Sequence, residues 1–474
     1  MSHQDTDGLT PLPRQLQDLK RVLGWLIKPA DLAGITFRRD CSWTPVALIF
    51  AALLWSWSDE KTLTQRFRLA RKAVALMAIL PRVPATTYQA FLKMLRTWTP
   101  RLAMALVVAL RGRMLGDLAS RFKVAGFAVF GADGSRLGLP RTQSNEGRFT
   151  AASVTRRRAK ARAARRRART RAHRDRRARQ KKADTPQMWI TVLSHIGTGL
   201  PWDWRLGPSD SSEREHLRQM VAGLPEGALV TADAGFVGYQ TWTAILGDGR
   251  DLLVRVGANV RLLKGLGYAR TRGDWVYLWP DREAARGNPP LVLRLVVAHS
   301  GRHPVYLVTS VLDRDRLTDR QVAEVYALRW GLELFYRHFK QTYERRKLRS
   351  QTAEHAELEA TWSLLGLWAM GLHAQVDLAR AGVPASRVSV AGMLLAYRKS
   401  LREYKSDPDP GESLVELIGR AVIDAYRRRD KTSRDYPRKK HEPPTGAPKI
   451  GRATKAQIDL AQQIRDQQLS GLTA

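Results

Sequence analysis

The most informative stretch of this 474-residue chain reads Tyr326-Ala-Leu-Arg329-Trp-Gly-Leu-Glu333-Leu-Phe-Tyr-Arg-His-Phe-Lys340. On a helix with 3.6 residues per turn, its four numbered side chains fall within an arc of about 60°. Five apolar residues are expected on a separate face, roughly 120° around the helix. They are Val325, Leu328, Leu332, Phe335 and Phe339. The stretch therefore predicts a helix that buries one side and presents a polar row on the other.

This polar row suits a phosphodiester substrate. A carboxylate can hold a metal ion, and the two cations and the phenol hydroxyl can bind phosphate oxygens. Just upstream, Thr318-Asp-Arg-Gln321 predicts a capping box at the start of the helix. The alternative interpretation is an amphipathic surface helix whose charged face is only solvated, and the row alone does not decide between the two.

A single helical carboxylate cannot hold a catalytic metal ion, so further acids are expected at strand ends. The apolar run Val124–Phe130 leads into Gly131-Ala-Asp133-Gly-Ser, and a second run from Gly227 ends in Thr-Ala-Asp233-Ala-Gly-Phe. An acid directly after a buried strand lies where a sheet presents functional groups. The alternative for each is a turn aspartate that caps its own backbone.

With Asp133, Asp233 and Glu333 in this order and the spacing Tyr-x2-Arg-x3-Glu-x6-Lys, the chain resembles a DDE transposase of the insertion-sequence-4 family. The likeness covers roughly residues 120 to 375. It implies an α/β fold in which a ribonuclease H-like catalytic core is interrupted by a β-rich insertion. It also implies metal-dependent cleavage of double-stranded transposon-end DNA and strand transfer into target DNA, with the protein acting as a homodimer on DNA.

The resemblance also implies roles for the site residues. Asp133, Asp233 and Glu333 are the expected catalytic residues and the ligands of two Mg²⁺ (or Mn²⁺) ions, which oxygen-only ligands suit. Tyr326, Arg329 and Lys340 are expected to hold the end phosphate. Two other functions stay open: a non-catalytic DNA-binding relic of a transposase, and a nuclease of the same fold without strand transfer.

The composition favours a polyanionic partner. Lysine and arginine number 80 against 44 acids, a net charge of +36, which favours phosphate neutralisation and counterion release. The apolar stretches are shorter than the roughly 20 residues that span a bilayer, and the N-terminus has no signal pattern. A single cysteine excludes a disulfide framework within the chain. We therefore expect a cytoplasmic, nucleoid-associated protein with no membrane partner.

A strongly basic arm interrupts the predicted core. From Arg156 to Lys182, 16 of 27 residues are Arg or Lys, and most of the others are Ala. Two interpretations stand together: a disordered loop when free, and a DNA-backbone arm that becomes helical on binding. The arm's expected DNA contacts include Arg156, Arg157, Arg158, Arg165, Arg166 and Arg167. Because phosphate contacts carry no base information, the arm is expected to bind without sequence preference.

Six regions are expected along the chain. They are a helical N-terminal domain that binds the transposon end (1–118), the first part of the ribonuclease H-like core with the basic arm at 143–186 (119–256), a β-rich insertion (257–316), the second part of the core (317–383), a helical C-terminal region (384–429) and a basic, proline-containing tail (430–474).

Individual elements follow from periodicity and capping signals. Strands are expected at Val124–Phe130, Met188–His195, Trp202–Leu206, Leu229–Asp233 and Leu252–Val256, and helices near Ser212–Val221, Tyr239–Leu246 and Ala353–Ala381. The last of these helices is expected to close the core. The tail from Asp430 to Ile450 is expected to be disordered.

Overall fold

The computed structural model describes residues 12–77, 87–150, 186–269, 274–300, 303–403, 412–423 and 446–472. Its strands are β1 (Val129–Gly138), β2 (Gln187–His195), β3 (Leu200–Gly207), β4 (Leu229–Ala232), β5 (Asp251–Val256), β6 (Arg261–Lys264), β7 (Trp275–Leu278), β8 (Leu291–Ser300), β9 (His303–Thr309) and β10 (Lys449–Arg452).

The described residues form helices before, between and after these strands in the sequence. They are α1 (Arg14–Leu26), α2 (Pro45–Trp57), α3 (Leu63–Leu76), α4 (Tyr88–Asp117), α5 (Gln143–Phe149), α8 (Glu213–Val221), α9 (Tyr239–Gly247), α10 (Asp281–Ala284), α11 (Asp319–Leu328), α12 (Gly331–Arg337), the π-helix η4 (His338–Thr342), α13 (Ala353–Arg380), α14 (Val390–Glu403), α15 (Leu414–Gly419) and α16 (Lys455–Leu472).

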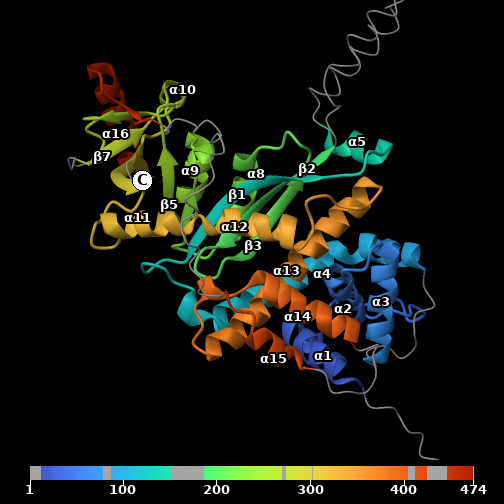
Figure 1. Ribbon diagram of the computed structural model, residues 1–474. Coiled ribbons are helices and arrows are strands. Elements are labelled where there is room, and N and C mark those ends of the chain that lie inside the picture. The colour runs from blue at the N-terminus through green and yellow to red at the C-terminus, as the bar shows by residue number, and fades with distance from the viewer. Residues whose placement is uncertain are drawn as a thin grey trace, which may run out of the picture.

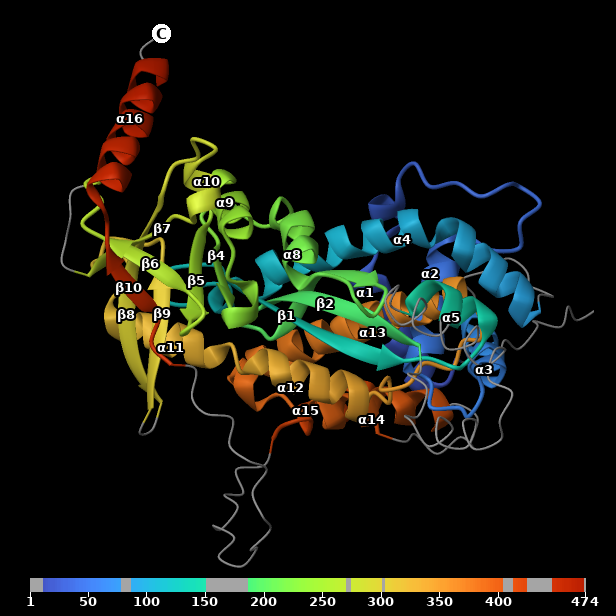
Figure 2. The same ribbon diagram turned by 90° about the horizontal axis from the view of Figure 1, so that it is seen from above.

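The fold is a mixed α/β architecture around one ten-stranded sheet, with strand order β10-β6-β7-β8-β9-β5-β4-β1-β2-β3 (Figure 1). Helices α8 and α9 lie on one face, and α11 and α12 lie on the other (Figure 2). The helices before β1, together with α13, α14 and α15, form a separate layer beside the β1–β3 end of the sheet. None of the described helices is long and apolar enough to cross a membrane.

Strand β1 lies inside the sheet, between antiparallel β2 and parallel β4. It begins five residues later than the predicted strand Val124–Phe130 and continues to Gly138, because β2 pairs with it without interruption from Phe130 to Gly138. Asp133 therefore lies in the middle of a strand rather than after one, and this expectation was wrong. Strands β2, β3, β4 and β5 and helices α8 and α9 match their predicted positions to within a few residues.

The predicted β-rich segment after β5 is confirmed as strands, and these strands extend the same sheet. Strand β9 pairs antiparallel with β5, and β8, β7 and β6 follow outward. Residues Lys449–Arg452 then add β10 in parallel to β6 at the outer edge, and α16 follows it. The expected disorder of the tail is therefore wrong at Lys449 and Ile450; residues 430–445 lie outside the described residues.

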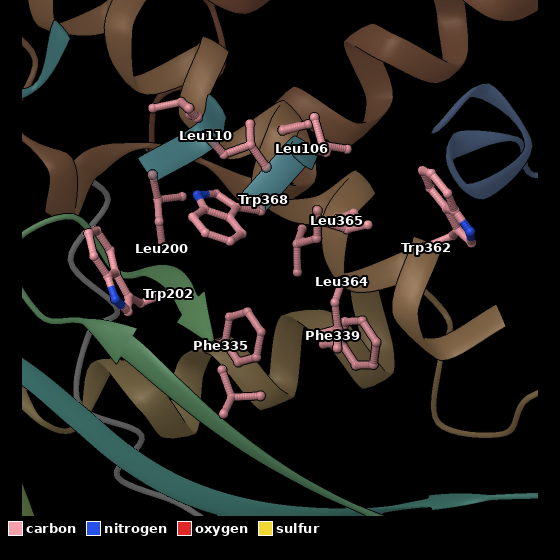
Figure 3. Packing of buried hydrophobic residues seen from close by; sticks show 14 of the residues in the cluster. Leu106, Leu110, Leu200, Trp202, Phe335, Phe339, Trp362, Leu364, Leu365 and Trp368 are labelled. Carbon is pink, nitrogen blue, oxygen red and sulfur yellow. The ribbon is translucent and has the colours of Figure 1, made fainter. Parts of the chain in front are cut away.

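The helical layer is held together by α13, as predicted. Helix α2 is apolar on all sides and fully enclosed, and its Trp57 Nε1 donates to the Gly366 carbonyl of α13 at 2.9 Å. A side chain at Gly366 would begin 2.2 Å from Ser56 Oγ, so this glycine permits the contact. Figure 3 shows how Phe335 and Phe339 of the α12–η4 segment face Trp368, Leu364 and Leu365 of α13.

Candidate active site

Asp133 lies on the face of β1 that α12 covers. Alternate residues of a strand share a face, so Asp133 and Gly131 point the same way. A side chain at Gly131 would begin 2.6 Å from Leu332 Cδ1, which explains why a glycine stands there: it lets α12 approach β1. The Asp133 carboxylate also accepts a hydrogen bond from Gly134 N at 2.9 Å.

Asp233 follows β4 directly, as the sequence predicts. In the parallel β1–β4 pair, Gly131 is the partner of Thr231. Two residues further along each chain, Asp133 and Asp233 therefore come to neighbouring positions. Asp233 Oδ1 accepts from Gly235 N at 2.8 Å, so it also caps its own turn. Both interpretations of this aspartate hold together.

The segment that carries Glu333 is not one continuous helix. The predicted capping box of Thr318 and Gln321 is present at the start of α11, but α11 ends before Arg329 and α12 begins at Gly331. Glu333 N donates to Trp330 O at 3.1 Å, an i to i+3 bond that tightens the chain at this joint.

The tightened joint changes which side chains are covered. Leu328, predicted to be on the buried face, is 49% exposed, whereas the other four apolar residues are buried. The joint places Arg329 Nη2 3.9 Å from Glu333 Oε1. Arg329 is nearly covered there, while Glu333 stays 43% exposed at the site.

The three acids act on one another electrostatically. Burial raises the pKa of the Asp133 carboxyl to about 6, with further raising by Asp233 and Glu333 against the Gly134 N–H and Arg329. Repulsion between neighbouring carboxylates favours a cation or a proton between them. Across the described residues, however, no three Asp, Glu, His or Cys side chains are arranged to hold a metal ion. The donor chemistry fits a hard divalent cation, while this conformation leaves the carboxylates apart.

A fourth acid, Glu213 at the start of α8, belongs to this group and was not predicted. A side chain at Gly134 would begin 2.4 Å from Glu213 Oε1, and one at Gly235 would begin 3.8 Å from Glu213 Oε2. Its carboxylate thus lies beside the neighbours of both aspartates. Burial, Asp133 and Asp233 raise the pKa of Glu213 to about 7. We call Asp133, Glu213, Asp233 and Glu333 the carboxylate cluster.

The acids at the start of α8 are visible in the sequence, but helix capping explains them without a role at the site. Ser212-Glu-Arg-Glu215 has the pattern of a helix-capping motif, and Ser212 Oγ does accept from Glu215 N at 3.4 Å. Acids in a first helical turn are common for that reason alone. Only the packing of α8 against β1 shows that the first of the two glutamates reaches the aspartates.

Tyr336 is a second residue that the sequence analysis missed, and it holds α12 to β1 at the site itself. Its hydroxyl donates to the Asp133 carbonyl at 2.7 Å and accepts from Val192 N at 3.2 Å. Complete burial raises its pKa well above the ordinary value, so the hydroxyl stays protonated. Tyr336 therefore fixes the backbone of Asp133 relative to the helix that bears Glu333.

Arg329 and Lys340, the two cations of the predicted polar row, lie next to the carboxylate cluster. Lys340 lies in the π-helix η4, and its Nζ donates to Ser135 Oγ of β1. Burial and Arg346 lower the pKa of Lys340, and Asp133 opposes them. The Arg329 guanidinium lies 5.4 Å from the centre of the Tyr326 ring. Burial raises the pKa of this phenol.

The structure thus brings Asp133, Asp233, Glu333, Arg329 and Lys340 to one region of the sheet, with Tyr326 against Arg329. The predicted arm contacts lie outside the described residues. They are Arg156, Arg157, Arg158, Arg165, Arg166 and Arg167.

A mixed α/β sheet that gathers acids and cations at its parallel strands defines a class of protein suited to phosphate chemistry. Residues 141–368 match the family model of the transposase DDE domain. The match contains Asp233 and Glu333 and begins after Asp133. Over these residues the chain is therefore similar to the transposase DDE domain, and the predicted resemblance to the insertion-sequence-4 family is confirmed.

Two individual proteins are similar to the chain. The transposase InsG for insertion sequence element IS4 from Escherichia coli (strain K12) is 27% identical over 207 residues, which are 40% of this chain and 45% of that protein. The chain thus matches less than half of that relative's length. The cryo-EM structure of the piggyBac transposase synaptic complex with hairpin DNA aligns over 90% of this chain and 89% of the other, with 12% identity and a TM-score of 0.41.

Proposed function

We propose that this protein is an active DDE transposase, which cleaves double-stranded DNA at transposon ends and joins those ends to target DNA. The observation that carries the proposal is the carboxylate cluster. Three of its acids stand in the order and spacing of the family, and the pKa of Asp133 responds to both Asp233 and Glu333. Such mutual repulsion, next to cations, is what a site for a metal and a phosphodiester requires.

The inner strands support a ribonuclease H-like core. Their order β5-β4-β1-β2-β3, with β2 antiparallel to both neighbours and β4 and β5 parallel to β1, is the order of that fold. On this proposal, β6 to β9 are the insertion between the second aspartate and the glutamate. The six regions predicted from the sequence are kept as the proposed domain division, with the N-terminal helices as the end-binding part.

The proposed cofactor is a pair of Mg²⁺ or Mn²⁺ ions. Asp133, Asp233 and Glu333 would hold the ions, and Glu213 would add a further oxygen donor. Such ions supply activation of a water or a 3′-hydroxyl and charge stabilisation at the leaving oxygen. Asp133 and Asp233 are oriented even in the absence of metal ions. Gly134 N donates a hydrogen bond to the first carboxylate, and Gly235 N donates one to the second.

The proposed role of Arg329, Lys340 and Tyr326 is to hold the phosphate next to the scissile bond. Arg329 is 12% exposed and fixed by Glu333 and the Tyr326 ring, so little side-chain freedom remains to be lost on binding. Lys340 is held next to β1, because its Nζ donates a hydrogen bond to Ser135 Oγ. Charge-assisted bonds of this kind are the strong ones in phosphate recognition.

DNA at the transposon end and target DNA are the proposed partners, with two copies of the chain acting together on them. The basic arm from Arg156 to Lys182 is proposed to add sequence-independent phosphate contacts. Loss of a catalytic acid would favour a relic that only binds DNA, but all three acids are present.

Cleavage and joining of a labelled duplex test the proposal. The duplex carries the DNA that flanks the gene on each side, where a transposon would have its inverted repeats, and it is incubated with protein and Mg²⁺ in the presence of unlabelled target DNA. We expect nicked ends and joined products, and neither with EDTA. Cleavage without joining would identify a nuclease, and binding without cleavage would identify a relic.

A further inference from the structure

A second feature of the sheet, a cleft at its outer end, is not used by the chemistry above. It has a volume of about 810 Å³ and lies between the chain that follows Asp233, strands β6 and β7, and the edge strand β10. Figure 2 shows these elements together at the end of the molecule from which α16 projects. The C-terminal segment thus builds one wall of the cleft.

The cleft is basic. Four cations line it, and Asp281 is the one acid among its lining residues. They are Arg214, Arg261, Lys449 and Arg452, and all four are exposed. No ion pair of these four occurs within the part of the chain that the structure describes. We call this feature the cationic cleft.

The pairing of β10 with β6 sets like charges against each other. In this short parallel ladder, Lys449 is the partner of Arg261, and Arg452 is the partner of Lys264. Like charges at paired positions destabilise a sheet. The two pairs are three residues apart and so alternate between the faces of the edge strand. Each face of the edge strand therefore carries one pair of positively charged side chains. A bound anion would reduce the repulsion within such a pair.

The cleft is linked to the carboxylate cluster by the segments that carry two of its acids. Arg214, which lines the cleft, follows Glu213 directly, and its Nε donates to Gly235 O at 2.8 Å. Gly235 N in turn holds Asp233. Val237 and Gly238, a few residues further on, form the adjacent wall. The loop after β4 and the start of α8 therefore contribute residues both to the cleft and to the carboxylate cluster.

We propose that the cationic cleft binds the backbone of duplex DNA on its way to the carboxylate cluster, and that the C-terminal strand β10 completes this track. The inference rests on the proposed function for the identity of the polyanion. A chain of phosphates, one about every 3.4 Å of axis on each strand, matches the four cations spread along the cleft better than a single small anion does. The cleft lies at the exposed edge of the sheet, and Asp281 is the one acid that lines it, so a long anionic ligand can enter it.

A charge reversal at Lys449 tests the proposal with two readouts of opposite sign. Lys449→Glu replaces a like-charge pair by an ion pair with Arg261, so the melting temperature should stay unchanged or rise. Duplex binding, measured by fluorescence anisotropy, should weaken about tenfold at low salt, with the slope of log K against log salt falling by about 1 to 2. Lys20→Glu on the distant, exposed surface of α1 makes the same change in net charge and should alter the affinity less than about twofold.

Site-directed cross-linking gives a second measurement that does not depend on affinity. Cys41 is the single cysteine, so Cys41→Ser provides a clean background. Ile450→Cys, placed at an exposed position in the cleft, should form a disulfide with thiol-modified duplex, and Leu395→Cys on α14 should not. Equal yields at both positions, or equal affinities of Lys449→Glu and Lys20→Glu, would overturn the proposal.

The outcomes also separate this inference from the proposed function. If Lys449→Glu abolishes binding of polyglutamate but leaves duplex binding intact, the cleft takes an acidic protein segment and the DNA track is refuted. If wild-type protein fails to cleave or join DNA while the Ile450→Cys cross-link forms, the transposase proposal fails and the cleft stands. If cleavage and joining proceed normally in Lys449→Glu with unchanged duplex affinity, the cleft proposal fails and the transposase proposal stands.

Discussion

The carboxylate cluster and the cationic cleft lie on one sheet and are opposites in charge, yet they are built in the same way. Each sets like charges against each other: Glu213 against Asp133 and Asp233 in the first, Lys449 against Arg261 in the second. Neither arrangement stabilises the free protein. Both regions therefore favour a ligand of opposite charge, which we propose to be a divalent cation in one and a phosphate backbone in the other.

The two regions differ in how firmly they are held. The cluster stands on inner strands and is fixed by buried contacts, of which Tyr336 to Asp133 is the clearest. The cleft stands on the edge strand and on exposed side chains. Substitutions in the cluster should therefore change chemistry, and those in the cleft should change affinity.

The largest effect is expected at Glu333. Glu333→Gln keeps the shape of the side chain but removes the charge that would hold a metal ion, so cleavage should fall on the order of a thousandfold. DNA binding without metal should persist, because the cationic cleft and the basic arm are unchanged. The assay is single-turnover cleavage beside a gel shift in EDTA. Cleavage at the wild-type rate would show that the cluster does not act through its charge, which breaks the comparison.

A smaller loss is expected from the cations beside the cluster. Arg329→Ala and Lys340→Ala each remove a charge-assisted contact worth about 1.5–3 kcal/mol, so binding of the transposon end should weaken roughly ten- to a hundredfold. Excess Mn²⁺ should not restore the reaction, because the lost contact is to phosphate. Arg320→Ala, an exposed arginine on α11, is the matched control. Rescue by metal would assign these residues to the cluster instead.

Tyr336→Phe tests whether the cluster depends on fixed backbone positions. The change leaves the Asp133 carbonyl and Val192 N–H without this buried partner, at a cost of about 1–3 kcal/mol in the free energy of unfolding. Cleavage by folded protein should also slow several-fold. Tyr343→Phe, which removes a buried bond to Ser56 away from the cluster, should lower stability alone. Equal cleavage rates in the two variants would make Tyr336 a packing residue only.

The smallest effect concerns the pH dependence of stability without metal. Glu213 has a raised pKa of about 7, so the folded state holds this proton more tightly and loses stability as the pH rises from about 4 to 7. Glu213→Gln should therefore match the wild type at pH 4.5 and melt at a higher temperature at pH 8. Added Mg²⁺ should reverse the order at pH 8 by stabilising the wild type more.

The neighbouring Glu215 gives the control of opposite sign. Hydrogen bonds from Arg218 and Gln219 lower its pKa, so its contribution to stability is present at high pH and lost on acidification. Glu215→Gln should lower the melting temperature at pH 8 and leave it unchanged near pH 3. If Glu213→Gln behaved like Glu215→Gln, Glu213 would be an ordinary helix-capping acid outside the cluster.

Much of the inner sheet followed from local signals. Strand β4 and its terminal Asp233, helix α13 and the capping box at Thr318 were predicted because apolar runs and capping residues act within a few positions of themselves. The break between α11 and α12 was not predicted. Its residues continue the helical period, and the tightened turn at Arg329 forms where α12 must fit against Gly131 of a distant strand.

By itself, the sequence determined the kind of chemistry: three acids, a row of cations and a large positive charge, all of which are properties of residue type and spacing. Only the tertiary structure decided which charges meet. Glu213 joined the aspartates because Gly134 leaves room beside β1, and Lys449 met Arg261 because β10 completed an edge that β6 left open. Interactions between exposed charges are largely screened beyond about 8–10 Å at physiological salt. Such pairs therefore exist only where long-range packing brings remote segments into contact.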